Sequence, residues 1–271
     1  MSTNYPHCKI NIGLNIVGKR PDGYHNLETI FYPIPLHDEL TIEESSVDSL
    51  DIEGTPLDGD WTSNLVVRAM NLLRPEGFHI PPQRIHLRQN IPCGAGLGGG
   101  SSDAAFMMKM LNTNYQLGLK DQEMEQLLSG LGADCPFFVK TKHFFAEGIG
   151  NLFTPIDLSL SGWHLALVKP NDHISTKEAY AGVTPQRPAT HLLTAVASNV
   201  EDWKESVRND FEASILPAHP AIAQIKETLY AEGAIYASMS GSGSSVYGLF
   251  REPSPITQQT FPDCFVHNCV L

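Results

Sequence analysis

The segment that decides the fold of this chain is Pro92-Cys93-Gly94-Ala95-Gly96-Leu97-Gly98-Gly99-Gly100-Ser101-Ser102-Asp103. Its five glycines fall within seven positions. Glycine reaches backbone conformations that turn successive N–H groups inward, and without a Cβ it lets an anion approach the main chain. Good helix formers follow Asp103, and a helix beginning there adds the partial positive charge of its N-terminus. We therefore predict that the segment holds phosphate, with Ser101 and Ser102 donating to phosphate oxygens or ligating magnesium. The alternative is that Ser101 is only the helix N-cap.

Two standard phosphate-binding patterns do not account for this segment. Gly94, Gly96 and Gly99 satisfy GxGxxG, but a dinucleotide fold also needs a strand ending in an acidic residue about 20 positions later. The sequence there, Asn112 to Lys120, is polar and loop-like. A Walker A match over Gly13 to Arg20 fails at its last position, where Arg20 replaces the magnesium-binding Ser or Thr. Neither a dehydrogenase nor a P-loop enzyme is therefore expected.

Length and charge narrow the class of protein further. The chain has 271 residues, of which 42% are hydrophobic and 18% charged, so it can bury a substantial core and is neither disordered nor a disulfide-stapled miniprotein. Its net charge of −12 repels polyanions, so no nucleic-acid or membrane partner is expected. A phosphorylated small molecule remains possible, because backbone amides and a few cations can override the global charge locally.

Cysteine usage and the N-terminus predict a cytoplasmic location. The five cysteines form no CxxC pair, and their odd number fits a reducing compartment. The first 20 residues lack a signal-peptide pattern, and no window approaches the roughly 18 apolar residues of a membrane span.

Periodicity along the chain predicts mixed α and β structure. Apolar residues alternate over 9–17 and recur over 27–34, and the turn residues Arg20-Pro21-Asp22-Gly23 between them predict a β-hairpin. Helical spacing predicts a helix over 64–73 that is capped by Asn64 or Ser63 and stops before Pro75. Further strands are expected over 40–43, 84–89, 137–139, 144–147, 165–168, 235–240, 246–250 and 265–270, and helices from Asp103 onward and over 122–131, 192–199 and 222–232. We place a domain boundary near residue 155.

Four separate motifs together resemble the GHMP kinase superfamily. They are Lys9-Ile-Asn11, Pro92 to Ala105, Gly132-Ala-Asp-Cys-Pro136 and Met239-Ser-Gly-Ser-Gly-Ser244, which span nearly the whole chain in the right order. Taken alone, Asp134 and the 240–245 segment are weak signals that also fit an ordinary turn. The resemblance implies a two-lobed α+β kinase with an N-terminal ribosomal-protein-S5-like α/β lobe over 1–155 and a C-terminal ferredoxin-like α+β lobe over 156–271, and an active site between them.

The resemblance also implies catalytic and nucleotide-binding residues. Asp134 would accept the proton of the attacking hydroxyl, and Lys9 would pair with Asp134 and with the transferring phosphoryl group. Ser101 or Ser102 would lie near magnesium. Phosphoryl transfer depends on positioning and charge neutralisation more than on covalent help, so this set of groups is sufficient. The residues implied to bind ATP are Asn64, Pro92, Gly94, Ala95, Gly96, Leu97, Gly98, Gly99, Gly100, Ser101 and Ser102.

Three further motifs narrow the implied substrate. Arg20-Pro-Asp-Gly-Tyr-His25, Asn64-Leu-Val-Val-Arg-Ala69 and Asn209-Asp-Phe-Glu212 are similar to superfamily members that phosphorylate the 2-hydroxyl of a cytidine-diphosphate-linked methylerythritol in non-mevalonate isoprenoid synthesis. Tyr24 and His25 would hold the cytosine, and Tyr180 would stack on its other face. The remaining residues implied to contact this substrate are Asn11, Asp134, Gly241 and Ser242.

Two other functions stay open from the sequence. A GHMP kinase for homoserine, mevalonate or a sugar would share the phosphate segment but has no need of Tyr24, His25 and Tyr180. A regulator of the same fold would bind ATP without a working Asp134. For the kinase the expected ligands are ATP with Mg2+ and a small molecule, and the expected state is a monomer or weak homodimer.

Overall fold

The computed structural model describes residues 1–54 and 60–271, which form two compact units. Unit 1 comprises residues 1–8, 36–93 and 98–141, and unit 2 comprises residues 9–35, 94–97 and 142–271. Each unit is thus built from segments far apart in the sequence. The predicted boundary near residue 155 concerns functional lobes and stays a prediction.

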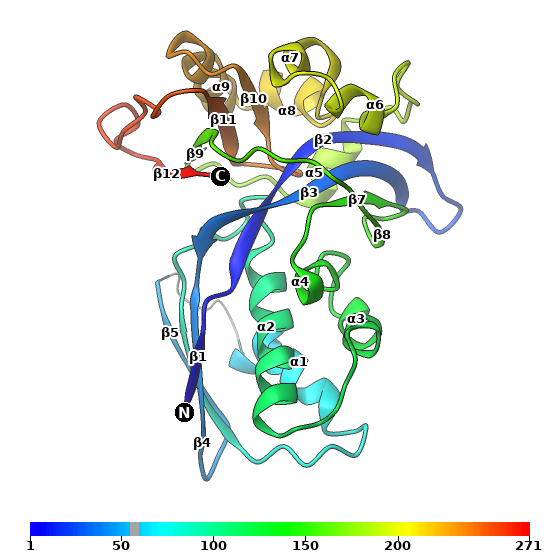
Figure 1. The fold of residues 1–271 in the computed structure, drawn as a ribbon, viewed down its shortest axis with the longest axis vertical. Helices are drawn as coiled ribbons and strands as arrows, with labels where there is room; N and C mark the ends of the chain where they lie inside the picture. Colours follow the sequence, from blue (N-terminus) through cyan, green and yellow to red (C-terminus); the bar gives the residue numbers. More distant parts are fainter. Residues whose placement is uncertain (55–59) are drawn as a thin grey trace. The chain divides into compact units, whose positions relative to one another are not determined.

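Unit 1 pairs a four-stranded sheet with a group of helices. The strands β1 (Ser2–Asn4), β4 (Glu39–Glu44), β6 (Gln83–Arg88) and β5 (Ser49–Glu53) lie in the order β1-β4-β6-β5, with β5 parallel to β6 and the other pairs antiparallel. Ile42 and Leu40 on β4 are in register with Ile85 and Leu87 on β6, and all four are buried. This period of two gives the sheet one apolar face, against which the helices lie (Figure 1).

The helices of unit 1 are α1 (Leu65–Leu73), α2 (Gly99–Asn114), α3 (Asp121–Ser129) and α4 (Phe137–Lys140), with a 3-10 turn, η1, over Trp61–Ser63. The side chain of Asn64 caps α1 by accepting a hydrogen bond from the amide of Val66 at 2.9 Å, which confirms the predicted cap. Residues 137–139 were expected to be extended, but they form the single turn α4, because Pro136 begins it with a helical φ of −61°.

Unit 2 contains two further sheets. The first has the order β2-β3-β7-β8, formed by β2 (His7–Lys19), β3 (His25–His37), β7 (Phe144–Glu147) and β8 (Leu152–Pro155). The amide of Arg20 donates to the carbonyl of Tyr24 at 2.8 Å where the chain turns from β2 to β3, so the predicted hairpin is confirmed.

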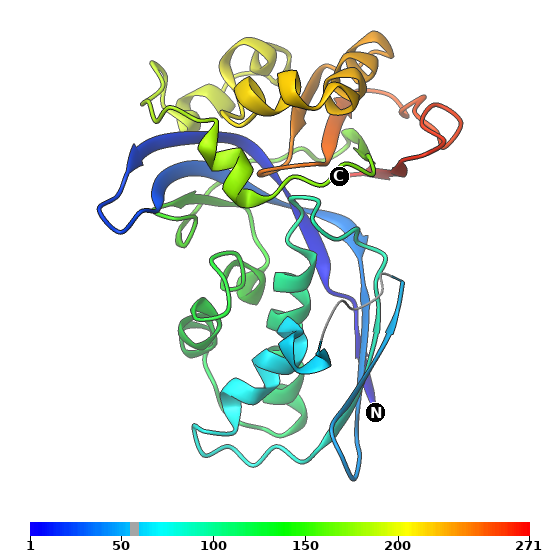
Figure 2. The same cartoon turned by 180° about the vertical axis from the view of Figure 1, so that it is seen from behind.

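The second sheet of unit 2 is antiparallel, with the order β10-β11-β9-β12. Its strands are β9 (His164–Lys169), β10 (Tyr236–Met239), β11 (Val246–Phe250) and β12 (Phe265–Val270). The remaining elements of the unit are α5 (Thr176–Ala181), α6 (Leu192–Val196), η2 (Val200–Asp202), α7 (Trp203–Ser206), α8 (Glu212–Ala218) and α9 (Pro220–Ala231). Helix α9 covers β10 and β11 (Figure 2), and Ile222, Ile225 and Leu229 bury its apolar side.

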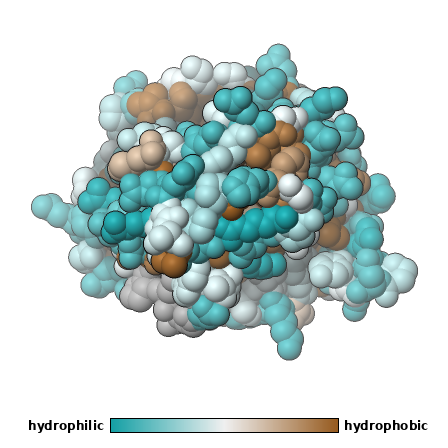
Figure 3. Space-filling view, turned by 90° about the horizontal axis from the view of Figure 1, so that it is seen from below, coloured by the Kyte–Doolittle hydropathy of each residue, from teal (hydrophilic) through white to brown (hydrophobic). Residues whose placement is uncertain are grey.

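The helices and one face of the surface show how apolar residues are distributed. Within the described residues, the helices are all too short or too polar to cross a bilayer. On the face drawn in Figure 3, hydrophilic residues surround small and separate hydrophobic areas.

Candidate active site

Lys9 and Asn11 occupy alternate positions near the start of β2 and form the centre of a buried polar network in unit 2. The Lys9 side chain is only 3% exposed. Its Nζ donates to Oδ1 of Asn11 at 2.6 Å and to the carbonyl of Gly96 at 2.9 Å, and it lies 4.8 Å from the ring centroid of Phe31. A buried ammonium group needs such partners, because its transfer from water is otherwise very costly. The network therefore holds one positive charge at a fixed place.

Gly96 can lie in this network only because it has no side chain. Its φ is +73°, and a Cβ built on it would overlap the carbonyl oxygen of Ser240. The same carbonyl of Gly96 that accepts from Lys9 also accepts from Oγ of Ser240 at 2.9 Å. Gly94, with φ of +60°, is less tightly packed: the ring of His173 would be 3.1 Å from an added Cβ. The glycines predicted to let an anion approach the backbone are thus required by close contacts here.

The second small-residue segment, 240–245, joins the same network. Ser240 Oγ accepts from the amide of Asn11 at 3.1 Å, and a Cβ on Gly241 would lie 3.2 Å from Oδ1 of Asn11. Lys9, Asn11, Gly96 and Gly241 are therefore brought together within unit 2. Ser242 follows as a half-buried residue.

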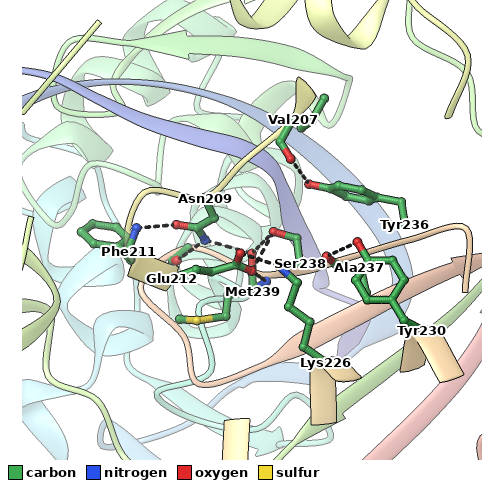
Figure 4. Close-up of polar contacts among 11 residues, drawn as sticks. Val207, Asn209, Phe211, Glu212, Lys226, Tyr230, Tyr236, Ala237, Ser238 and Met239 are labelled. Carbon is green, nitrogen blue, oxygen red and sulfur yellow. Dashed lines mark hydrogen bonds and ion pairs between the residues drawn. The ribbon is translucent and has the colours of Figure 1, made fainter. Parts of the chain in front are cut away.

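The Asn209-Asp210-Phe211-Glu212 motif anchors that second segment (Figure 4). The side-chain amide of Asn209 donates to the carbonyls of Met239 and Gly241 at 3.0 and 2.8 Å. Glu212 Oε1 accepts from the amide of Met239 at 2.7 Å, and the other carboxylate oxygen pairs with Lys226. The sequence presented this motif only as part of a resemblance. Its partners became visible only when the fold placed β10 beside α8.

In unit 1 the glycine segment continues into α2. Gly98, with φ of +73°, is the N-cap, and no side chain caps the helix. The helix begins at Gly99, four residues before the expected start at Asp103, so Ser101 lies in the first turn and the alternative that it is only the N-cap is excluded. Ser101 is half-buried, whereas Ser102 is fully buried and its Oγ has no hydrogen-bond partner among the described residues. An uncapped helix start of this kind favours an anion.

Two buried carboxyl groups, those of Asp38 and Asp103, lie near the start of this helix. The sequence did not predict this pair. Asp38 Oδ1 accepts from the amides of Asn90 and Ile91 at 2.6 and 2.7 Å, directly before Pro92. Burial and the neighbouring Asp38 raise the pKa of Asp103 well above its usual value, and burial also raises the pKa of Asp38. Two neighbouring buried carboxyl groups cannot both ionise readily, so the pair keeps a proton to a higher pH than a free carboxyl group does. Nothing in the sequence around Asp103 indicates that Asp38 would be its neighbour.

The other nucleotide and catalytic residues implied by the resemblance lie in unit 1. Asn64 uses its side-chain oxygen to cap α1. Asp134 lies half-buried in the turn between α3 and α4. Its neighbour Cys135 is buried, and burial raises the pKa of that thiol.

The aromatic residues expected to hold the base lie in unit 2, at the end of the hairpin and on α5. Tyr24 is 62% exposed. The rings of His25 and Tyr180 stack, with centroids 5.0 Å apart and an interplanar angle of 20°. Because stacked atoms contact at roughly 3.5 Å, this separation means that the rings are laterally offset by a similar distance. His25 thus covers only part of the Tyr180 face.

Comparison with known proteins shows the family to which this chain belongs. The GHMP kinases N terminal domain matches residues 64–142, and the GHMP kinases C terminal domain matches residues 192–259. The 4-diphosphocytidyl-2-C-methyl-D-erythritol kinase of Parabacteroides distasonis is 52% identical over 97% of both chains. The chain belongs to the GHMP kinase family.

Solved structures agree with this assignment. The crystal structure of a 4-(cytidine 5'-diphospho)-2C-methyl-D-erythritol kinase superposes with a TM-score of 0.82 and 28% identity, covering 98% of each chain. The mevalonate kinase of Methanococcus jannaschii shares the fold, with a TM-score of 0.69 at 16% identity over 100% of this chain and 98% of its own. The expected two-lobed α+β kinase fold is therefore confirmed.

Proposed function

We propose that this chain transfers the γ-phosphoryl group of ATP to the 2-hydroxyl of 4-diphosphocytidyl-2-C-methyl-D-erythritol, a step of non-mevalonate isoprenoid synthesis. The observation that carries the proposal is the 52% identity over 97% of the chain to a kinase of that name. The chain acts as a cytoplasmic monomer or weak homodimer.

The glycine segment fits the phosphates of ATP. Gly94 and Gly96 have positive φ, a backbone conformation that can turn successive N–H groups toward an anion. Gly98 to Ser102 present the uncapped start of a 16-residue helix. Pro92, Ala95, Leu97 and Gly100 complete the segment, and Asn64 lies toward the adenine.

Magnesium fits the same segment through a hydroxyl group rather than an acidic cluster. Across residues 1–54 and 60–271, no three His, Cys, Asp or Glu side chains gather to hold a metal. Mg2+ commonly keeps several waters and binds one or two protein groups plus substrate phosphates, so a cluster is unnecessary. Ser101, half-buried in the first turn of α2, is the better ligand, because Ser102 is fully buried. The ion supplies charge neutralisation on the transferring phosphoryl group.

Asp134 and Lys9 carry the proton and charge changes of the reaction. Asp134 accepts the proton of the 2-hydroxyl as that oxygen forms its bond to the γ-phosphorus, and the bond from phosphorus to the ADP oxygen breaks. The Lys9 ammonium, fixed by Asn11 and Gly96, stabilises the negative charge on the transferred group. Gly241 and Ser242 bind the substrate beside Asn11.

The pyrimidine binds at the end of the hairpin. The pyrimidine base lies beside the His25 ring and in its plane, so that it forms hydrogen bonds with the edge of the imidazole. In this position it stacks on the part of the Tyr180 ring that His25 leaves uncovered. Tyr24, 62% exposed, covers its other face. Stacking of this kind contributes about 1–3 kcal/mol per base.

The test is ADP release with ATP, magnesium and a panel of acceptors: the cytidyl-diphospho-methylerythritol, homoserine, mevalonate and galactose. We expect turnover of the cytidyl compound alone and its loss in Asp134→Asn. Turnover of another acceptor would overturn the substrate assignment but keep the kinase, and ATP binding without any turnover would favour a regulator.

A further inference from the structure

A histidine outside the proposed active site bridges the helix that carries Tyr180 and the loop that precedes this helix. His219, at the start of α9, is 18% exposed. Its Nε2 lies 2.8 Å from Oε1 of Glu178 on α5, and its Nδ1 lies 3.3 Å from Oδ2 of Asp172 in the loop that precedes α5. These two carboxylates are the charged groups that face the ring, and both ring nitrogens can donate to them only when the imidazole is protonated.

The Asp172 end of this bridge reaches the second glycine segment. The buried hydroxyl of Ser244 donates to the carbonyl of Asp172 at 2.7 Å. The next residue, His173, is the neighbour that an added Cβ on Gly94 would meet. The loop at Asp172 is therefore fixed against parts of both glycine segments within unit 2.

The Glu178 end of the bridge reaches the aromatic pair. Glu178 and Tyr180 share the short helix α5, which has one turn and a half and few backbone hydrogen bonds of its own. Tyr180 packs edge-on against Phe211, with centroids 4.9 Å apart, and stacks on His25. A helix this short takes its position from its side-chain contacts, so displacing Glu178 displaces Tyr180 and, through the stack, His25.

We propose that His219 is a positioning residue: its imidazolium bridges Asp172 and Glu178, fixes α5, and so sets Tyr180 and His25 for the pyrimidine end of the substrate. The inference rests on the proposed function, since it assigns the base to His25 and Tyr180. The hydrogen bond to Glu178, with that to Asp172, raises the pKa of His219 above its usual value, so the bridge persists to a higher pH than an isolated imidazole would allow and opens as the pH rises through that pKa.

The experiment compares the wild type with His219→Gln, which donates from one amide nitrogen only, where the imidazolium donates from two ring nitrogens, and which carries no charge. The binding of cytidine 5'-diphosphate is measured by calorimetry, and the KM values for the cytidyl substrate and for ATP are measured from about pH 6 to about pH 9. We expect His219→Gln to weaken cytidine diphosphate binding and raise the cytidyl KM about three- to tenfold near neutral pH, with the KM for ATP unchanged. The wild-type cytidyl KM should rise with pH, and that rise should vanish in the variant.

Two further variants make the result specific. Glu178→Gln, at a side chain that is 45% exposed, removes one negative charge from the bridge without touching α9 and should also raise the cytidyl KM. His164→Gln, at a half-buried histidine of β9, is the matched control and should change neither KM.

The outcomes separate this inference from the proposed function. If the wild type binds cytidine diphosphate and turns over the substrate, but both variants match it in affinity and pH profile, the role of His219 is overturned and the kinase stands. Equal losses in both KM values would mean a structural role only and would also overturn it. A wild type that binds no cytidine diphosphate would overturn the proposed substrate itself.

Discussion

The Oγ of Ser240 donates a hydrogen bond to the carbonyl of Gly96 at 2.9 Å, although 144 positions separate the two residues. The same hydroxyl accepts from the amide of Asn11 at 3.1 Å. One buried serine thus joins both glycine segments to the strand that carries Lys9, and its removal leaves a buried N–H without its partner.

For Ser240→Ala we expect a loss of about 1–3 kcal/mol in the free energy of unfolding, because the amide of Asn11 stays buried and unpaired. Activity should fall roughly tenfold or more, since the support of Gly96 and Gly241 is lost. Urea unfolding and steady-state kinetics measure both. Ser161→Ala, at an exposed serine of the same unit, is the control and should be neutral. Wild-type stability in Ser240→Ala would show that the bond contributes little.

For Gly96→Ala we expect a larger effect than for Gly118→Ala. Both glycines have nearly equal positive φ, +73° and +74°, so both substitutions carry the same backbone strain of about 1 kcal/mol. Only at Gly96 would the new Cβ overlap the Ser240 carbonyl, whereas nothing lies within 4 Å at Gly118. The Gly96 variant should therefore lose ATP binding as well as stability, measured by calorimetry and urea unfolding. Equal behaviour of the two variants would contradict the close contact.

For Lys9→Met we expect kcat to fall by about 100-fold or more across the whole pH range, because a fixed charge is removed from the transferring phosphoryl group. A pH-rate profile is the measurement. Lys19→Met, at an exposed lysine near the end of the same strand, should behave as the wild type. An acid limb shifted upward in Lys9→Met would show instead that Lys9 acts by keeping Asp134 ionised.

For Asp103→Asn we expect a gain in stability that grows with pH. The pKa of Asp103 is raised by folding, so above about pH 4 the unfolded chain releases a proton that the native state retains, and wild-type stability falls as the pH rises. An amide has no such proton to lose. The free energy of unfolding is measured from about pH 4 to about pH 8 for both proteins. Asp51→Asn, at an exposed residue of β5, is the control, and parallel profiles for Asp103→Asn and wild type would contradict the shared proton.

Local rules predicted much of the fold. The alternation around Ile10 and Ile12 and the turn at Gly23 gave the hairpin, and Asn64 with its spaced apolar residues gave α1, because caps and periodicity act over a few positions. The start of α2 was missed because Gly98 takes a left-handed φ that lets the glycines after it join the helix. The pattern of side chains does not predict the backbone conformation of Gly98.

The sequence by itself predicted that this protein holds phosphate, since a dense run of glycines before a helix has few physical uses other than bringing backbone amides to an anion, and the four motifs together indicated its class through a resemblance. Only the tertiary structure decided which residues distant in the sequence contact one another. The bond from Ser240 to Gly96, the carboxyl pair of Asp38 and Asp103, and the bridge from His219 to Glu178 all join segments distant in the chain. Their energies depend on burial and on short distances between the groups, and both are set by how the elements pack.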